Sequence, residues 1–150
     1  MNFLIKNMTL LIFTDIDGTF INNDTFDEGS NTKTISELAQ AQHSVVFNTS
    51  KTFEEVAYFQ KKIKTSLSFI CETGGGIYIA NDNFKKTRSS RGAYQVLYES
   101  RKITEYKDQI QSEINKKYRD DLTFFDDLSI EEQSSLSGLS GHDLELASRR

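Results

Sequence analysis

Three short apolar runs alternate with two amphipathic stripes in the first half of this 150-residue chain. The runs occupy residues 9 to 14 and the stretches around Val46 and Phe69. Between them, apolar side chains recur at helical spacing, in one stripe with Ile35, Leu38 and Ala39 and another with Phe53, Val56, Ala57, Phe59 and Ile63. Such strand and helix alternation predicts a parallel sheet with right-handed crossovers, and therefore an α/β fold.

The first run ends in two carboxylates, Asp15 and Asp17, which Gly18 and Thr19 follow. An apolar run of this length is typical of a strand covered on both faces, and ligands of parallel sheets lie beyond the carboxyl ends of the strands. Because side chains alternate along a strand, we expect Asp15 and Asp17 to share a side while Ile16 turns toward the core. Gly18 lets the chain leave the strand without a Cβ penalty.

Two carboxylates this close repel each other unless a cation, a shared proton or nearby donors compensate. Mg²⁺ suits them because it takes oxygen ligands, usually one or two carboxylates with water and substrate phosphate. A carboxylate beside such an ion can attack phosphorus and form an aspartyl phosphate. The alternative is that both aspartates simply begin a loop, where Asp is common. The preceding strand and the following Gly-Thr favour the functional interpretation.

The second run ends in hydroxyl groups and a cation, Thr49, Ser50, Lys51 and Thr52, just before the second stripe. Hydroxyls and backbone amides at the N-terminus of a helix form a cradle for phosphate. The same residue types commonly cap helices, and both roles are compatible because one hydroxyl can cap while its neighbour faces a ligand. For Lys51 two positions remain open: reaching the substrate, or lying along the helix surface.

The segment Asp15-Ile16-Asp17-Gly18-Thr19 resembles the first motif of the haloacid dehalogenase superfamily of phosphohydrolases. The resemblance implies that Asp15 is the nucleophile and Asp17 the general acid/base. It also implies that Mg²⁺ binds the carboxylate of Asp15 and the backbone carbonyl of Asp17, and that Gly18 and Thr19 contact the phosphate.

Thr49 stands at the place of the superfamily's second motif, a Thr or Ser after the second strand. The resemblance therefore implies that Thr49, Ser50 and Lys51 bind the phosphate. Ser50-Lys51-Thr52 is also similar to the Ser-Lys-Thr of one branch, the mannosyl-3-phosphoglycerate phosphatases, which belong to the Cof-like group with an inserted cap domain.

The segment Glu72-Thr73-Gly74-Gly75 resembles the Glu-Asn-Gly-Gly turn of the same branch, although Thr73 stands where the family usually has Asn. Locally, we expect Gly74 to Gly76 to form a hairpin turn rather than a nucleotide loop, since the Gly-Lys-Ser/Thr ending of a P-loop is missing. Residues 123–127 and 136–140 resemble the cap signature of the branch, so the resemblance covers nearly the whole chain.

The resemblance implies a partial Rossmann-like core, a parallel sheet with flanking helices, over residues 1–86 and the start of an inserted α+β cap over residues 87–150. The change in composition at the polar tract 85–92 predicts the boundary between core and cap there. We further expect Asn31 or Thr32 to cap the first helix. In the cap we expect a long charged helix over about residues 99–118, a short strand over residues 122–125 and two short helical stretches. We expect the long helix to pack through an apolar stripe formed by Ile103, Tyr106, Ile110 and Ile114.

The function implied is that of a Mg²⁺-dependent phosphomonoesterase acting on mannosyl-3-phosphoglycerate. Alternatives are another Cof-like sugar-phosphate phosphatase, or a non-catalytic remnant that binds metal or a partner chain. The superfamily's third-motif Lys and acidic fourth motif are absent up to Arg150. We therefore expect this chain to be the N-terminal part of a longer enzyme, with little activity alone; Met8 is an alternative start to Met1.

Composition and charge limit the partners and the cellular compartment that we expect for the chain. The formal net charge of −4 gives no general attraction to nucleic acid, and the apolar runs are too short to span a membrane. A single cysteine, Cys71, excludes an internal disulfide and suits a reducing cytosol; its apolar neighbours predict a buried, inert thiol. We expect a cytoplasmic protein whose partner is a small phosphorylated sugar or glycerate, with an ordinary surface role for His142.

Overall fold

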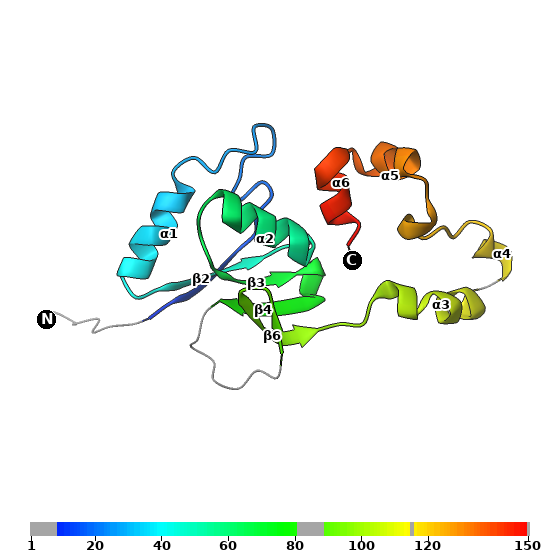
Figure 1. Cartoon of the computed structure of the whole chain (residues 1–150), viewed down its shortest axis with the longest axis horizontal. Helices are drawn as coiled ribbons and strands as arrows, with labels where there is room; N and C mark the ends of the chain where they lie inside the picture. Colours follow the sequence, from blue (N-terminus) through cyan, green and yellow to red (C-terminus); the bar gives the residue numbers. More distant parts are fainter. Residues whose placement is uncertain (1–8, 81–88, 115, 150) are drawn as a thin grey trace, which may run out of the picture.

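The computed structural model describes residues 9–80, 89–114 and 116–149. Its centre is a six-stranded sheet with the strand order β1-β2-β3-β4-β6-β5 (Figure 1). The strands are β1 (Leu11–Thr14), β2 (Ser44–Asn48), β3 (Ser68–Cys71), β4 (Gly76–Ala80), β5 (Ser90–Arg91) and β6 (Tyr94–Glu99). β1, β2 and β3 run parallel, whereas β4, β6 and β5 pair antiparallel. The predicted α/β fold with a parallel sheet is confirmed.

Two helices, α1 (Asn31–Gln40) and α2 (Phe53–Lys62), connect the three parallel strands. α2 begins after Thr52, whose side chain forms a capping box with Glu55. The expected cap of α1 is wrong: Ser30 holds the N-cap position without a side-chain hydrogen bond. Asn31 instead donates from its side-chain amide to the carbonyl of Phe20 at 2.7 Å, which ties the preceding loop to the helix.

One core lies between the sheet and these helices. It gathers Ile35 of α1 and Val56 of α2 with Phe47 and Phe69 of the parallel strands, and Ile16 lies fully inside it. Aromatic rings pack closely around Phe53, whose ring centroid lies 4.6 Å from that of Tyr78. The expectation that Ile16 turns toward the core is confirmed.

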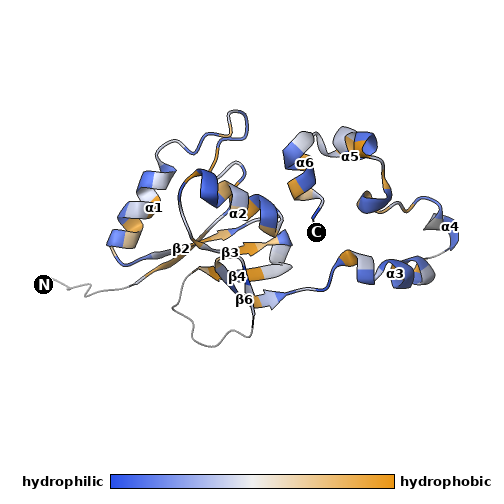
Figure 2. Cartoon of the chain, in the orientation of Figure 1, coloured by the Kyte–Doolittle hydropathy of each residue, from blue (hydrophilic) through white to orange (hydrophobic). Residues whose placement is uncertain are grey.

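The other face of the sheet is open. Leu11 and Phe13 are 60% and 55% exposed, and Leu97 of β6 is 53% exposed. The expectation that the first strand is covered on both faces is therefore wrong for the described part of the chain, because α1 and α2 both contribute to the core on one face. Figure 2 shows apolar colour along the strands, whereas α3 (Lys107–Glu113) and α5 (Ile130–Ser137) are largely hydrophilic.

The sheet continues beyond the expected domain boundary. β6 pairs with β4 from Tyr94 to Glu99, so these residues belong to the core sheet rather than to a cap. Residues 81–88, which include Phe84 of the expected hairpin and the start of the boundary tract, lie outside the described part. We therefore propose that the cap begins after Glu99 instead of at residue 87.

The segment after the sheet is built from short helices. They are 3₁₀ turns at Ile103–Glu105 and Phe125–Asp127, and the α-helices α3, α4 (Lys116–Arg119), α5 and α6 (Gly141–Ala147). The expected long helix is wrong because its first residue, Glu99, ends β6 and the helical residues fall into separate short pieces. Ile103 and Tyr106 are 42% and 37% exposed, so this half of the stripe is not part of a buried core. The expected strand at residues 122–125 is not formed; Phe125 begins a 3₁₀ turn.

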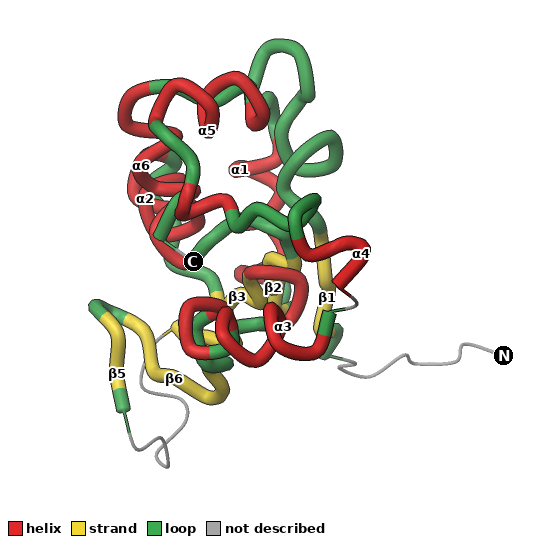
Figure 3. The backbone as a smooth tube through the Cα atoms, turned by 90° about the vertical axis from the view of Figure 1, so that its right-hand side faces the viewer, coloured by secondary structure: helices red, strands yellow, loops and turns green. Residues whose placement is uncertain are grey.

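The end of the chain returns to the core. α6 buries Leu144, Leu146 and Ala147, and it packs against α2, beside which it lies in Figure 3. Within the described residues, no helix has the length and apolar character needed to cross a membrane.

Candidate active site

Two chain segments leave the sheet at the same edge. Asp15 follows Thr14, the last residue of β1, and Thr49 follows Asn48, the last residue of β2. The parallel register pairs Thr14 with Phe47, so both segments begin within one residue of each other across the ladder. This edge is the carboxyl end of parallel strands, where ligands of such sheets bind.

The turn after β1 is anchored in the core. The carboxylate of Asp15 accepts a hydrogen bond from the backbone amide of Ile16 at 2.7 Å. The carbonyl of Ile16 in turn accepts from the amides of Phe20 and Ile21 at 3.0 and 2.9 Å. Because Ile16 is fully buried, the two aspartates on either side of it are fixed at the surface of the core.

Gly18 makes the turn possible. Its φ of +68° lies in the left-handed region, and a Cβ there would lie 2.8 Å from the side-chain nitrogen of Asn23. Asp17, one residue earlier, pairs through an isolated parallel bridge with Ile21, while Thr19 is exposed between them.

Lys51 joins the two segments. Its ammonium lies 3.1 Å from a carboxylate oxygen of Asp17 and 3.7 Å from one of Glu55, and its side chain is only 25% exposed. The ammonium thus lies between the turn after β1 and the first turn of α2, and contact of Lys51 with a substrate stays a prediction. A cation at this point offsets the repulsion between Asp15 and Asp17.

Two roles were possible for the hydroxyls after β2, capping α2 and facing a ligand, and Thr52 has the capping role. Thr52 caps α2, since its hydroxyl accepts from the amide of Glu55 at 3.2 Å and donates to the carbonyl of Leu146 at 3.0 Å. Thr49 is 4% exposed, and its hydroxyl accepts from the amide of Lys51 at 3.3 Å. The capping function belongs to Thr52, so Thr49 is not needed to begin the helix; Ser50 is exposed beside it.

The described residues supply only some of the ligands that a metal ion needs. Among the described residues, no group of three His, Cys, Asp or Glu side chains is placed to hold a metal. Asp15 and Asp17 offer carboxylate oxygens at a single turn, and one oxygen of Asp15 is bound by a backbone amide. Such a pair fits Mg²⁺, which keeps several waters and takes phosphate oxygens to complete its octahedron.

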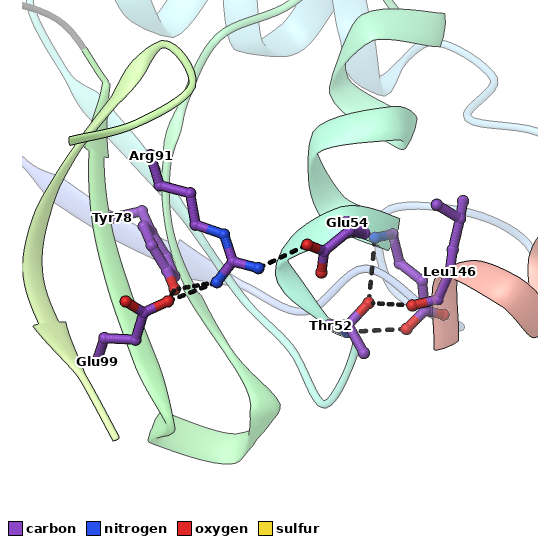
Figure 4. Close-up of polar contacts among 7 residues, drawn as sticks. Thr52, Glu54, Tyr78, Arg91, Glu99 and Leu146 are labelled. Atoms are coloured by element: carbon purple, nitrogen blue, oxygen red, sulfur yellow. Dashed lines mark hydrogen bonds and ion pairs between the residues drawn. The ribbon is translucent and has the colours of Figure 1, made fainter. Parts of the chain in front are cut away.

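A polar cluster near this edge was not found from the sequence. The guanidinium of Arg91 lies 2.5 Å from carboxylate oxygens of both Glu54 and Glu99, and it donates to the hydroxyl of Tyr78 at 3.3 Å (Figure 4). It also lies over the ring of Phe53, 4.3 Å from the centroid. Burial and the hydrogen bond to Glu99 raise the pKa of Tyr78 above its ordinary value. The cluster fixes the β5–β6 hairpin against the start of α2, and no local motif signals it.

Comparison with known proteins gives this geometry a context. A family model described as haloacid dehalogenase-like hydrolase matches residues 12–135. The chain is 32% identical over 146 residues to a glucosyl-3-phosphoglycerate/mannosyl-3-phosphoglycerate phosphatase of Methanococcoides burtonii, covering 95% of this chain and 53% of the relative. It is 30% identical over 145 residues to a mannosyl-3-phosphoglycerate phosphatase of Pyrococcus furiosus, covering 95% and 58%. The chain thus spans about half the length of the curated relatives it matches.

Solved structures share the fold. A crystal structure of a Thermotoga maritima protein aligns with a TM-score of 0.55 at 16% identity, over 88% of this chain and 48% of that one. A phosphatase of the haloalkanoate enzyme superfamily from Bacteroides thetaiotaomicron aligns with a TM-score of 0.54 at 11% identity, over 87% and 47%.

Proposed function

Because the chain belongs to the haloacid dehalogenase-like hydrolases, we propose that it is part of a Mg²⁺-dependent phosphatase that hydrolyses mannosyl-3-phosphoglycerate to mannosylglycerate and phosphate. The observation that carries the proposal is the placement of Asp15 and Asp17 at the carboxyl edge of β1 and β2, with Lys51 beside Asp17, in a chain about a third identical to phosphatases of that name.

In the proposed reaction, a carboxylate oxygen of Asp15 attacks phosphorus in line with the leaving oxygen. The new bond is an aspartyl phosphate, and the bond that breaks joins phosphorus to the glycerate oxygen. Asp17 donates a proton to that oxygen and later takes a proton from the water that hydrolyses the aspartyl phosphate. Mg²⁺, held by the Asp15 carboxylate and the Asp17 backbone carbonyl, would supply positive charge to the phosphate oxygens.

The neighbouring residues would bind the phosphoryl group. Thr49 offers a buried hydroxyl, and Lys51 brings a cation to the same edge of the sheet. Gly18 and Thr19 would add backbone amides from the turn, and Ser50 a hydroxyl. Groups fixed in this way stabilise charge that develops in the transition state, because they need no reorganisation.

A related sugar phosphate is the second candidate substrate. Thr73, at the position where the branch usually has Asn, lines the cavity beside the proposed site. The Methanococcoides burtonii relative is itself named for a glucosyl as well as a mannosyl substrate. A cytoplasmic location stays a prediction of the sequence.

The test uses a chimera, since this chain spans about half of its relatives' length. Residues 1–150 are joined to the part of the Methanococcoides burtonii relative that lies outside the matched region, and phosphate release is measured with saturating Mg²⁺. We expect turnover of mannosyl-3-phosphoglycerate by the chimera and little or none by the 150-residue chain alone. Asp15→Asn should reduce the rate to background, because it removes the anionic nucleophile.

The order of the variants makes the test specific. Asp17→Asn should slow turnover strongly, whereas Thr49→Val removes one hydroxyl and should cost about 1–3 kcal/mol. Asp24→Asn, at an exposed aspartate of the same loop, is the matched control and should leave the rate unchanged. A chimera that works at the normal rate with Asp15→Asn, or robust turnover by the isolated chain, would contradict the proposal.

A further inference from the structure

The carboxylate of Glu55 in α2 makes two separate contacts. One oxygen accepts a hydrogen bond from the backbone amide of Thr52 at 2.8 Å, which is part of the capping box. The other oxygen lies 3.7 Å from the ammonium of Lys51, and the side chain of Glu55 is only 15% exposed. A single carboxylate thus joins the start of the helix to the cation beside Asp17.

The capping box needs only one of these two oxygens. Glutamine serves at this position of a box as glutamate does, because either side chain offers an oxygen to the N-cap amide. A negative charge also suits the N-terminus of any helix, and Glu132 brings one to the capping box of α5. The contact with Lys51 is therefore a feature of Glu55 that capping does not explain.

Lys51 lies where a cation does not help the helix. It comes just before the N-cap residue of α2, at the end of the helix that carries partial positive charge. The first turn of α2 holds two acids, and Arg91 binds one of them, Glu54. Glu55 is thus the acid of this turn that lies beside Lys51, while Asp17 approaches the same ammonium from the turn after β1.

The two acids beside Lys51 differ in how firmly they are held. Thr52 is fully buried; its hydroxyl accepts from the amide of Glu55 at 3.2 Å and donates to the carbonyl of Leu146 in α6 at 3.0 Å (Figure 4). Glu55 is therefore fixed to a residue that the docking of α6 holds in place. Asp17 lies on a turn, and its side chain is 39% exposed. Glu55 is the firmer of the two anchors for the ammonium.

We propose that Glu55 is a positioning residue of the active site, which holds the ammonium of Lys51 in place before a phosphate group arrives. The inference rests on the proposed function, in which Lys51 binds that phosphate, and adds a residue that acts through Lys51. A cation that is already oriented stabilises the charge of the transition state without reorganisation. Glu55 itself does not touch the substrate in this role.

The first test observes Lys51 directly in the 150-residue chain without substrate. In ¹⁵N-labelled protein, NMR detects the ammonium groups of lysines, and the signal that Lys51→Met removes is that of Lys51. Its protons should exchange with water more slowly than those of Lys33, which has the same spacing from Glu37 but is 80% exposed. Glu55→Gln keeps an oxygen for the capping box but removes the charge, so exchange at Lys51 should become about threefold faster or more.

Two control variants isolate the contact with Lys51. Glu132→Gln makes the same exchange in the capping box of α5, at an exposed residue, and should leave the Lys51 signal unchanged. Glu37→Gln removes the acid that pairs with Lys33 and should also leave the Lys51 signal unchanged. Equal proton exchange at Lys51 in Glu55→Gln and in the unchanged protein would overturn the inference.

The second test asks whether Glu55 acts through Lys51. In the chimera, Glu55→Gln should lower kcat by about threefold or more, but it should have no effect when Lys51→Met is already present. A residue needed only for the structure of α2 would slow both backgrounds equally. That result, or an unchanged kcat in Glu55→Gln, would overturn the inference. If the chimera shows no turnover at all, the proposed function fails, and the NMR comparison still decides whether Glu55 holds Lys51.

Discussion

The backbone of Thr73 is held in an unfavourable conformation. Its φ and ψ are 55° and 37°, and the φ of Gly74 is 100°. The amide of Gly75 donates to the carbonyl of Glu72 at 3.1 Å, so these residues form a type I′ turn. Asn-Gly suits this turn best, because Asn tolerates the left-handed region that a β-branched residue resists. The family's usual Asn at this position therefore has a conformational explanation.

Replacing Thr73 with Asn should stabilise the protein by about 1 kcal/mol, since it relieves part of the cost of a left-handed residue. Thermal unfolding of the variant should show a higher Tm. Thr34→Asn, the same exchange inside α1, is the control and should give no gain, because the two residues have similar helix propensity. A Tm at or below that of the unchanged protein would show that the turn is not strained by Thr73.

Cys71 is the buried, inert thiol that the sequence predicted. It is 1% exposed, and burial raises its pKa from 9.0 to about 12. The unfolded chain therefore loses this proton at lower pH than the folded one, so the contribution of Cys71 to stability falls as pH rises above about 9. Urea midpoints at about pH 8 and pH 10 should decrease less in Cys71→Ala than in the unchanged protein. An equal decrease in both would contradict the shift.

At the scale of elements, the contact between α2 and α6 depends on Thr52. This fully buried residue caps α2 and binds the carbonyl of Leu146. Thr52→Val should destabilise the protein by about 1–2 kcal/mol through the lost cap, and should also release α6. Hydrogen exchange should then speed up at residues 144–147. Ser129→Ala removes the same kind of capping box from α5 and is the matched control. Unchanged exchange in α6 after Thr52→Val would show that the helix is held by its apolar residues alone.

The elements differ in how well local pattern predicts them. β1, β2, β3 and the two crossover helices follow from short apolar runs and helical spacing, which are local signals. The helix expected over about residues 99–118 overlaps β6 only at Glu99. Its apolar residues Ile103 and Tyr106 keep a helical spacing, although they belong to no single helix. The placement of Asp15 and Thr49 at one edge could be predicted from strand order. The Arg91 cluster and the Thr52–Leu146 bond join residues 37 and 94 positions apart, so no window of sequence contains them.

At the scale of the whole molecule, one face of the sheet exposes apolar side chains. A hollow of about 660 Å³ on the molecule is lined by Leu11, Phe13, Val46, Ile77 and Leu97, among others. Exposed apolar patches of this kind bind hydrophobic dyes. Phe13→Asn should lower the fluorescence of bound anilinonaphthalene sulfonate. Phe26→Asn is the control: Phe26 is 63% exposed but lies in the loop before α1, so the fluorescence should not change. Equal dye binding in both variants would contradict an apolar face centred on β1.

The most direct test of the proposed chemistry is a search for phosphate on Asp15. The chimera carrying Asp17→Asn is mixed with mannosyl-3-phosphoglycerate and Mg²⁺, quenched in acid, digested and examined by tandem mass spectrometry. Because this variant retains the nucleophile but lacks the acid/base, we expect a phosphoryl group on Asp15 that hydroxylamine removes. Adding Asp15→Asn should abolish the label. Product formation without any label on Asp15, or a label on another residue, would contradict the covalent mechanism.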